Sequence, residues 1–197
     1  MKLIKTFFIG ATALTLSACA MGGGAKGQKV SEEKFAAEAA KVEDHQYSKA
    51  TVKYSIVEKH KNDGEKDVNE KGTLKFSFSN GSWELDAGQN MPEAIGEYED
   101  YLGLRISYAM SMIPSGEEAY TVSYYTNPLG VYAKMSQKAS ESGVSISMSA
   151  SSYMGFDKYG YLVEATSSYD YSYKVSVAGV SSSQSANEKM EVNISYQ

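Results

Sequence analysis

The sequence predicts an α+β fold, in which two helical segments pack on one face of a strongly curved antiparallel sheet of about eight strands. After residue 47, apolar and polar residues alternate with a period of two along most of the chain, which is typical of strands with one buried face. The composition also favours strands, because tyrosine is abundant at 16 residues and proline is scarce at three. Two stretches with helical spacing account for the helical segments.

The first helical segment is predicted over residues 31–43. Ser31 is a good N-cap, and Glu32 and Glu33 fall in the first turn, where the helix dipole favours acidic residues. Its apolar residues form a narrow stripe, which indicates that the helix packs on a larger element; they are Phe35, Ala39 and Val42.

The second helical segment is predicted over residues 92–113, with Pro92 suited to its start and Pro114 to its end. Apolar residues there follow the helical period, and Gly103 is a candidate break. The part from Leu104 to Met112 also alternates as a strand would, so a strand remains an alternative for that part.

Eight strands follow from the alternation, over residues 47–59, 73–78, 83–85, 120–124, 131–135, 144–150, 161–177 and 190–196. Asn80-Gly81 predicts a type I′ hairpin turn, and residues 157–160 predict a second turn that ends in glycine. A serine-rich turn at 181–185 joins the last two strands, which are therefore predicted to pair as an antiparallel hairpin. The residues expected in their shared core are Met190, Val192, Ile194, Tyr196, Val163 and Val175.

The N-terminal segment has the features of an export signal. Lys2 and Lys5 precede an apolar run over residues 7–16, which is shorter than the about 20 residues that a membrane-spanning helix needs. The segment ends in Leu16-Ser17-Ala18-Cys19, and Cys19 is the only cysteine of the chain. This motif resembles a bacterial lipobox, which implies cleavage between Ala18 and Cys19 and acylation of the Cys19 thiol. An ordinary signal cleaved after Ala18 or Ala20 is the alternative.

The lipobox resemblance sets the expected domain organisation. Residues 1–18 are the signal peptide, residues 19–30 are the lipidated cysteine and a flexible glycine-rich tether, and residues 31–197 are a single mature domain. The resemblance implies a protein held by acylated Cys19 on the extracytoplasmic face of the cell membrane or the outer membrane. The chain carries a net charge of −5, which argues against nucleic acid as a partner.

Over residues 31–197 the pattern resembles the half-barrel fold of the lipoprotein-carrier (LolA-like) and mycobacterial lipid-transfer (LppX-like) lipoproteins. The resemblance implies a binding or carrier function for an apolar or lipid-like ligand held on a concave sheet face. The alternative function is a cell-surface module that binds a protein or a glycan.

The sequence contains no recognisable catalytic motif, and we expect neither an enzyme nor a cofactor or metal. His45 and His60 lie just outside opposite ends of the first predicted strand, too far apart to share a metal, and are interpreted as solvated loop residues. The acidic residues 63, 65 and 67 alternate in a loop that lacks the glycine of a calcium-binding EF-hand.

Two groups of residues are candidates for binding a ligand. Methionines adapt to irregular apolar ligands, and Met110, Met112, Met135, Met148 and Met190 therefore form the first group. Tyr169, Tyr171 and Tyr173 alternate on one strand face and form the second. Packing in the core of the sheet is the alternative role for both groups, and stacking on a glycan or peptide is a further role for the tyrosines.

Overall fold

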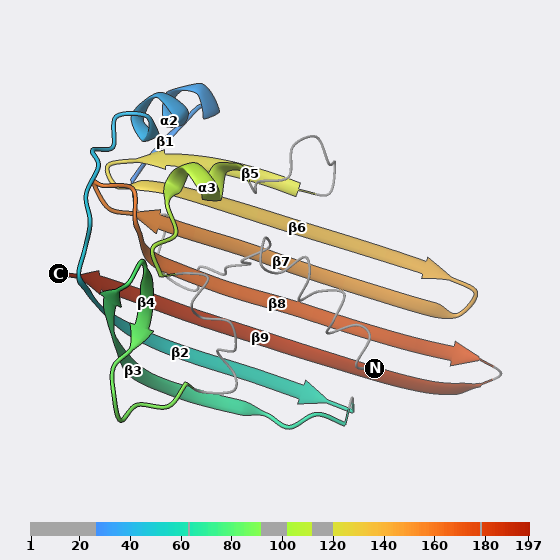
Figure 1. Cartoon of the computed structure of the whole chain (residues 1–197). Helices are drawn as coiled ribbons and strands as arrows, with labels where there is room; N and C mark the ends of the chain where they lie inside the picture. The colour runs from blue at the N-terminus through green and yellow to red at the C-terminus, as the bar shows by residue number, and fades with distance from the viewer. Residues whose placement is uncertain (1–26, 63, 92–101, 112–119, 178) are drawn as a thin grey trace.

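In a computed structural model of the chain, residues 27–62, 64–91, 102–111, 120–177 and 179–197 are described. These residues form one antiparallel sheet of nine strands that is not closed, with two short helices (Figure 1). The predicted single antiparallel sheet is confirmed. The predicted α+β class is corrected to mainly β, because helices α2 (Glu32–Ala39) and α3 (Ile106–Ser111) have only eight and six residues.

The strand order in the sheet is β1-β5-β6-β7-β8-β9-β2-β3-β4. Strands β6 to β9 extend past the ends of their shorter neighbours (Figure 1). The strand bounds are β1 Gln28–Val30, β2 Lys49–Lys61, β3 Val68–Ser79, β4 Ser82–Leu85, β5 Tyr120–Thr126, β6 Leu129–Glu141, β7 Val144–Phe156, β8 Leu162–Val177 and β9 Val180–Tyr196.

Strand β9 joins two groups of sequential strands. On one side it pairs with β8, which is the predicted hairpin, and on the other side with β2. The backbone of Gln197 continues this pairing, because its N–H donates to the Lys49 carbonyl at 2.9 Å. The predicted turn at 181–185 is wrong, since these residues lie inside β9 and the strand already begins at Val180. Serine-rich sequence continues this strand because its residues pair with β8 along their whole length, from Ser181 opposite Ser176 to Ser185 opposite Ser172.

The apolar core lies on one face of the sheet, at the end where the helices are. Ser31 caps α2 as predicted, and its Oγ accepts a hydrogen bond from the Lys34 N–H at 3.3 Å. Helix α2 ends at Ala39, earlier than predicted, but its apolar stripe packs as expected. The largest fully buried side chains are Phe35, Phe76, Phe156, Ile106, Leu162, Val52 and Val131.

The second predicted helix is confirmed in part. Gly103 has a φ of 79°, which is not helical, and α3 begins after it, at Ile106. The expected strand alternative does not apply to residues 106–111, which are helical. The earlier part of the predicted helix, residues 92–101, and its last two residues lie outside the described residues.

Three residues expected in the tether belong to the sheet. Gln28, Lys29 and Val30 form β1 and pair with Thr126, Tyr125 and Tyr124 of β5. Val30 is half-buried against the core, and a Cβ at Gly27 would lie 2.8 Å from the Thr126 carbonyl oxygen. The tether prediction is therefore wrong for these residues. The strand could not be predicted because it follows a glycine-rich sequence and, with three residues, is too short to show alternation.

A β-bulge changes the predicted core of the last hairpin. The register between β7 and β8 shifts at Gly155/Phe156, so that Phe156 pairs with Leu162. Leu162 is fully buried, whereas Val163 is only partly buried and lies outside the core cluster. Val175 also lies outside the core cluster, at the far end of β8. Val192 and Ile194 are buried as predicted, and Met190 and Tyr196 pack against the core.

A cluster of aromatic rings closes the end of the sheet near the C-terminus. Tyr47 stacks on Tyr196 with ring centroids 4.9 Å apart, and Tyr161 meets both rings. The Tyr47 hydroxyl donates to Asp157 Oδ2 at 2.7 Å, and the Tyr161 hydroxyl donates to the His45 carbonyl at 2.6 Å. The cluster thus ties the segment before β2 to the predicted turn at 157–160, where Asp157 Oδ1 accepts from the Tyr161 N–H.

Candidate functional site

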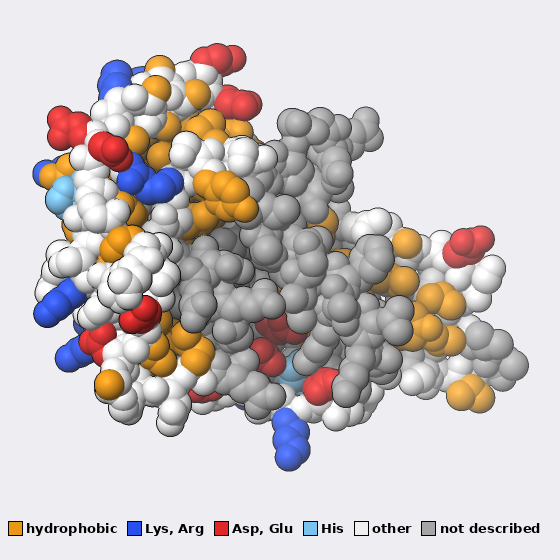
Figure 2. All heavy atoms as spheres, viewed as in Figure 1, with side chains coloured by type: hydrophobic (Ala, Val, Ile, Leu, Met, Phe, Trp, Pro, Cys, Tyr) orange, Lys and Arg blue, Asp and Glu red, His pale blue; other side chains and the backbone are white. Residues whose placement is uncertain are grey.

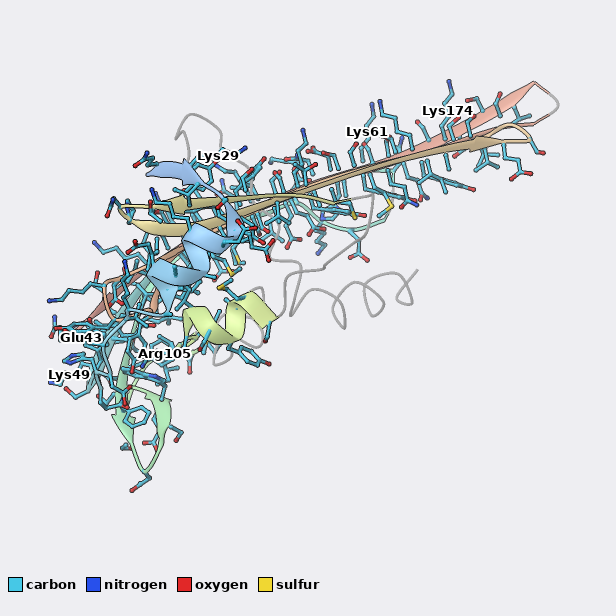
Figure 3. The ribbon with its side chains drawn as sticks, turned by 90° about the horizontal axis from the view of Figure 1, so that it is seen from above. Lys29, Glu43, Lys49, Lys61, Arg105 and Lys174 are labelled. Carbon is cyan, nitrogen blue, oxygen red and sulfur yellow. The ribbon has the colours of Figure 1, made fainter. Side chains whose placement is uncertain are left out.

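Strand register assigns the side chains of the sheet to two faces. Directly opposed residues of antiparallel strands share a face, and successive residues alternate between faces. We call the face that carries Val52, Phe76 and Ile194 the core face, and the other the opposite face. In the edge-on view of Figure 3, Lys61 and Lys174 point away from the side of the sheet on which the helices lie.

Five of the predicted ligand residues come together on the core face, beyond the core. We call this group the Tyr–Met surface, and its members are Met135, Met148, Tyr169, Tyr171 and Tyr173. Met148 lies opposite Tyr171, and Ala150 lies between Met135 and Tyr169. The rings of Tyr169 and Tyr171 are stacked, with centroids 6.4 Å apart and planes 9° apart. All five side chains belong to partly buried residues.

The other candidate residues lie elsewhere. Met110 on α3 and Met190 on β9 pack against the core, as expected for core filling. Met112, and the lipobox residues Ala18 and Cys19, lie outside the described residues. The structure therefore separates the methionines into a core pair and a pair on the Tyr–Met surface.

Acidic residues of β9 and β2 lie beside the Tyr–Met surface, in the same cross-strand row as Tyr169. Glu58 of β2 lies directly opposite Glu188 of β9, which in turn lies opposite Tyr169. His60 Nε2 is 3.4 Å from Glu58 Oε2, and the His60 side chain is only 3% exposed. Figure 2 shows acidic side chains and a histidine close together on this face. The interpretation of His60 as a solvated residue outside the strand is wrong, because it lies within β2 and its ring faces inward.

Burial and nearby acidic residues change the pKa values of tyrosines on the core face. Burial, with added repulsion from Glu188, raises the pKa of Tyr169 to about 12. Tyr54, nearer the core, donates its hydroxyl to Glu70 Oε1 at 3.2 Å, and burial raises its pKa. These phenols stay neutral hydrogen-bond donors at physiological pH. Among the described residues, no group of three or more His, Cys, Asp and Glu side chains is placed to hold a metal ion.

His45 is exposed, as expected for a loop residue, but its ring is not isolated. It stacks on Tyr159 at 4.2 Å between ring centroids and meets Tyr47 edge-on at 4.4 Å. The guanidinium carbon of Arg105 lies 4.4 Å above the centre of the Tyr161 ring in the same cluster. These contacts give His45 a packing role at the end of the sheet.

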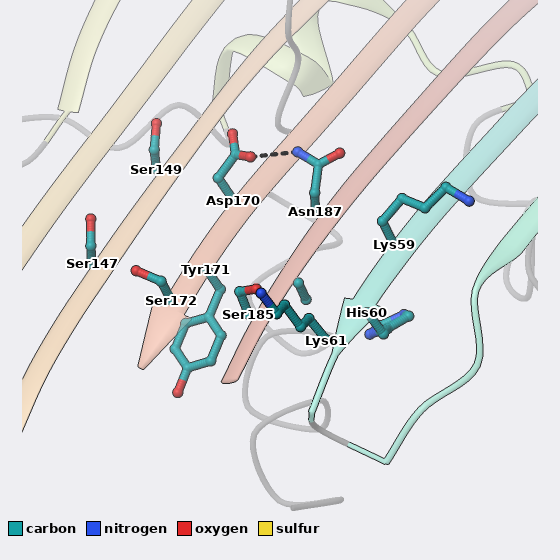
Figure 4. Close-up of a pocket in the computed structure, with 11 residues that line it drawn as sticks. Lys59, His60, Lys61, Ser147, Ser149, Asp170, Tyr171, Ser172, Ser185 and Asn187 are labelled. Atoms are coloured by element: carbon teal, nitrogen blue, oxygen red, sulfur yellow. Dashed lines mark hydrogen bonds between the residues drawn. The ribbon is translucent and has the colours of Figure 1, made fainter. Parts of the chain in front are cut away.

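A groove that the sequence did not reveal lies on the opposite face, and we call it the serine groove (Figure 4). Its volume is about 350 Å³, and it crosses strands β7, β8, β9 and β2. It is lined by Lys59, His60, Lys61, Ser147, Ser149, Asp170, Tyr171, Ser172, Ser185, Ala186 and Asn187. By alternation, the side chains of His60, Tyr171 and Ala186 belong to the core face, so these three residues border the groove through their main chains.

Two cross-strand rows build the groove. Ser149, Asp170, Asn187 and Lys59 form one row, and Ser147, Ser172, Ser185 and Lys61 form the next. Short side chains in the middle strands leave a depression, and the longer lysine side chains stand at its β2 edge. The Asn187 amide donates to Asp170 Oδ1 on the groove floor (Figure 4).

The serine groove is missed because serine alternating with apolar residues is what any half-exposed strand shows. The signal that was available is a run of small polar residues at equivalent positions of β7, β8 and β9. Only the register shows that these positions lie side by side, and the register is set by turns and by the bulge at Gly155/Phe156.

No protein-family model, curated protein or solved structure matches this chain. In the described part of the chain, neither helix has the length and apolar character required to cross a membrane.

Proposed function

We propose that the protein is a membrane-anchored extracytoplasmic lipoprotein that binds an apolar or lipid-like ligand without catalysing a reaction. The observation that supports this proposal is the Tyr–Met surface. It places two methionines and three tyrosines together on the same sheet face as the apolar core.

The chemistry of the Tyr–Met surface suits such a ligand. Methionine side chains are flexible and polarizable, so that Met135 and Met148 can adjust to an irregular alkyl chain. Tyrosine rings give wide apolar contact, and their hydroxyl groups supply directional hydrogen bonds at the edge of the ligand. The Glu58–Glu188 row next to this surface favours a ligand whose polar end carries hydrogen-bond donors.

The anchor and the curvature are parts of the same proposal. Acylated Cys19 would hold the domain at the extracytoplasmic face of a cell or outer membrane, within reach of lipids. An open sheet is compatible with the half-barrel of the lipoprotein-carrier resemblance, in which the core face would be concave.

A fluorescent apolar probe tests the binding site. We expect N-phenylnaphthylamine to bind the full-length protein, purified in a detergent that does not bind the probe. The double substitution Met148→Gln with Tyr171→Ser should weaken this binding by about tenfold or more, because burying each of the two side chains contributes about 1.5–3 kcal/mol. Tyr132→Ser is the control, because Tyr132 is partly buried on the opposite face. Equal affinity of the double variant and the wild type would exclude the Tyr–Met surface as the site. Native mass spectrometry of the wild type would identify a co-purifying lipid.

A further inference from the structure

We infer that the serine groove is a second binding site, for an acidic saccharide. This site lies on the face of the sheet opposite the Tyr–Met surface, and it does not depend on the proposed apolar ligand. Its volume of about 350 Å³ is within the range of small-ligand sites.

The hydroxyl groups of the groove indicate a ligand that both donates and accepts hydrogen bonds. Four serines line the groove, and each hydroxyl can act in both directions. The Asp170 carboxylate only accepts, so it would repel a bare oxyanion but accept bonds from sugar hydroxyls. The hydrogen bond from Asn187 holds this carboxylate in place on the floor.

The lysines of the groove indicate that the saccharide carries negative charge. Lys59 and Lys61 stand at the β2 edge, and Lys138 of β6 lies beyond the β7 edge, opposite Ser147. All three lysines are exposed, and the Lys59 Nζ also lies 2.9 Å from the Asp67 carboxylate. The rim of the groove is therefore positively charged although the chain as a whole has a net charge of −5, and this favours an anionic ligand.

The shape of the groove favours a short stretch of a saccharide chain. Crossing four strands gives a length of about 14 Å at the usual strand spacing. The floor consists of serine, aspartate and asparagine side chains, and no aromatic ring of the described residues projects into it by strand alternation. Nucleobases bind by stacking on such rings, so a nucleic acid fits the groove less well than a saccharide does.

Titration calorimetry of the full-length protein tests this inference, with tetragalacturonate as the acidic probe and maltotetraose as the neutral probe. We expect the acidic probe to bind and its affinity to fall with added salt. Lys61→Glu, which reverses a rim charge, and Ser172→Tyr, which fills the floor, should each weaken binding by about tenfold. Lys53→Glu is the matched control, because Lys53 is an exposed lysine on the same strand and face but outside the groove.

The outcomes separate a built site from simple charge attraction. Equal weakening by Lys53→Glu and Lys61→Glu would mean that the acidic probe responds only to net charge, which contradicts the site. No binding of tetragalacturonate, equal binding of maltotetraose, or tighter binding of single-stranded oligothymidylate would also overturn it. Circular dichroism melting curves of Lys61→Glu and Ser172→Tyr that match the wild type would show that a loss of binding is not a loss of fold.

Discussion

At the scale of single residues, two glycines in the sheet are covered by tyrosine rings. Tyr54 lies over Gly72 on the core face, and a Cβ at Gly72 would come within 2.5 Å of the Tyr54 hydroxyl oxygen. Tyr153 lies over Gly130 on the opposite face, where a Cβ would be 2.7 Å from its hydroxyl oxygen. In both places the missing glycine side chain is replaced by aromatic packing from a neighbouring strand.

The Gly72 contact predicts a measurable cost for one added methyl group. Gly72→Ala forces the Tyr54 ring out of its position, so the free energy of unfolding should fall by about 1–3 kcal/mol in urea denaturation. Combining it with Tyr54→Leu, which removes the clash, should give less than the sum of the two single losses. Thr73→Ala, an exposed neighbour, should change stability by less than about 0.5 kcal/mol. Additive losses in the double variant would show that the ring does not rest on Gly72.

The tyrosine hydroxyls predict a loss of stability in alkali. Burial, with added repulsion from Asp157 and Tyr161, raises the pKa of Tyr196, and burial raises the pKa of Tyr153 to about 12. The unfolded chain then releases phenol protons near pH 10 while the folded chain retains them, so stability is complete below about pH 10 and falls as the pH rises above it. The melting temperature should therefore drop between about pH 10 and about pH 12.

Tyr196→Phe checks the origin of this pH dependence. The variant lacks one of the perturbed phenols, so its melting temperature should fall less steeply with pH than that of the wild type. The same variant removes the hydroxyl that accepts from the Gly103 N–H at 3.3 Å, so a lower melting temperature at neutral pH is also expected. An unchanged slope above about pH 10 would exclude Tyr196 as a contributor.

Local features such as caps and turns could be predicted where a short sequence motif determines the backbone conformation. The Ser31 cap and the Asn80-Gly81 turn follow from adjacent residues, and both central residues of that turn have positive φ angles of 50° and 87°. The aromatic cluster was not predictable, because Tyr47 and Asp157 are 110 residues apart and meet only once the sheet has formed.

At the scale of elements, β9 has the largest structural role. Its core-face residues Val192 and Ile194 are 2% and 4% exposed, and they face β8 on one side and β2 on the other. Strand β9 is therefore an internal strand of the sheet with both edges paired.

Ile194 gives the test of this role. Ile194→Ala should lower the free energy of unfolding by about 2–5 kcal/mol, because it leaves a cavity in the core. Ser195→Ala, at the adjacent exposed position on the opposite face, should change it by less than about 0.5 kcal/mol. Deletion of residues 190–197 should abolish the cooperative transition seen by circular dichroism. A deletion variant that melts like the wild type would show that β9 is dispensable for the fold.

Element types were predictable from alternation, but element ends and neighbours were not. Strand β7 was predicted over seven residues and has 13, since polar positions such as Ser151 are stabilised by pairing on both sides. The pairing of β2 with β9 brings together residues about 140 positions apart, and no local pattern reports such a contact.

At the scale of the whole molecule, the two faces of one sheet carry different candidate sites. The Tyr–Met surface could be anticipated, because its residues alternate within single strands. The serine groove could not be anticipated, because its residues become neighbours only through the register of four strands. Sequence patterns alone therefore indicated one candidate site and not the other.

The proposed anchor predicts the distribution of the protein in cells. Cys19→Ser should prevent acylation and move the protein from the detergent phase to the aqueous phase in Triton X-114 partitioning, because the acyl chains supply the membrane affinity. The variant keeps residues 27–197, so its circular dichroism spectrum should match that of the wild type. Partitioning that does not change in the variant would rule out the lipobox interpretation.

The position of β9 also determines when the sheet can be completed during synthesis. Residues 180–196 are made after all other strands of the described sheet, yet they form an internal strand that joins β8 to β2. Until they emerge, the strands from β2 to β4 and those from β5 to β8 are two separate groups with unpaired edges. A chain with this order remains incompletely folded for most of its translation. Such a delay would suit the export across a membrane that we propose, because an exported chain crosses in an extended form before it folds.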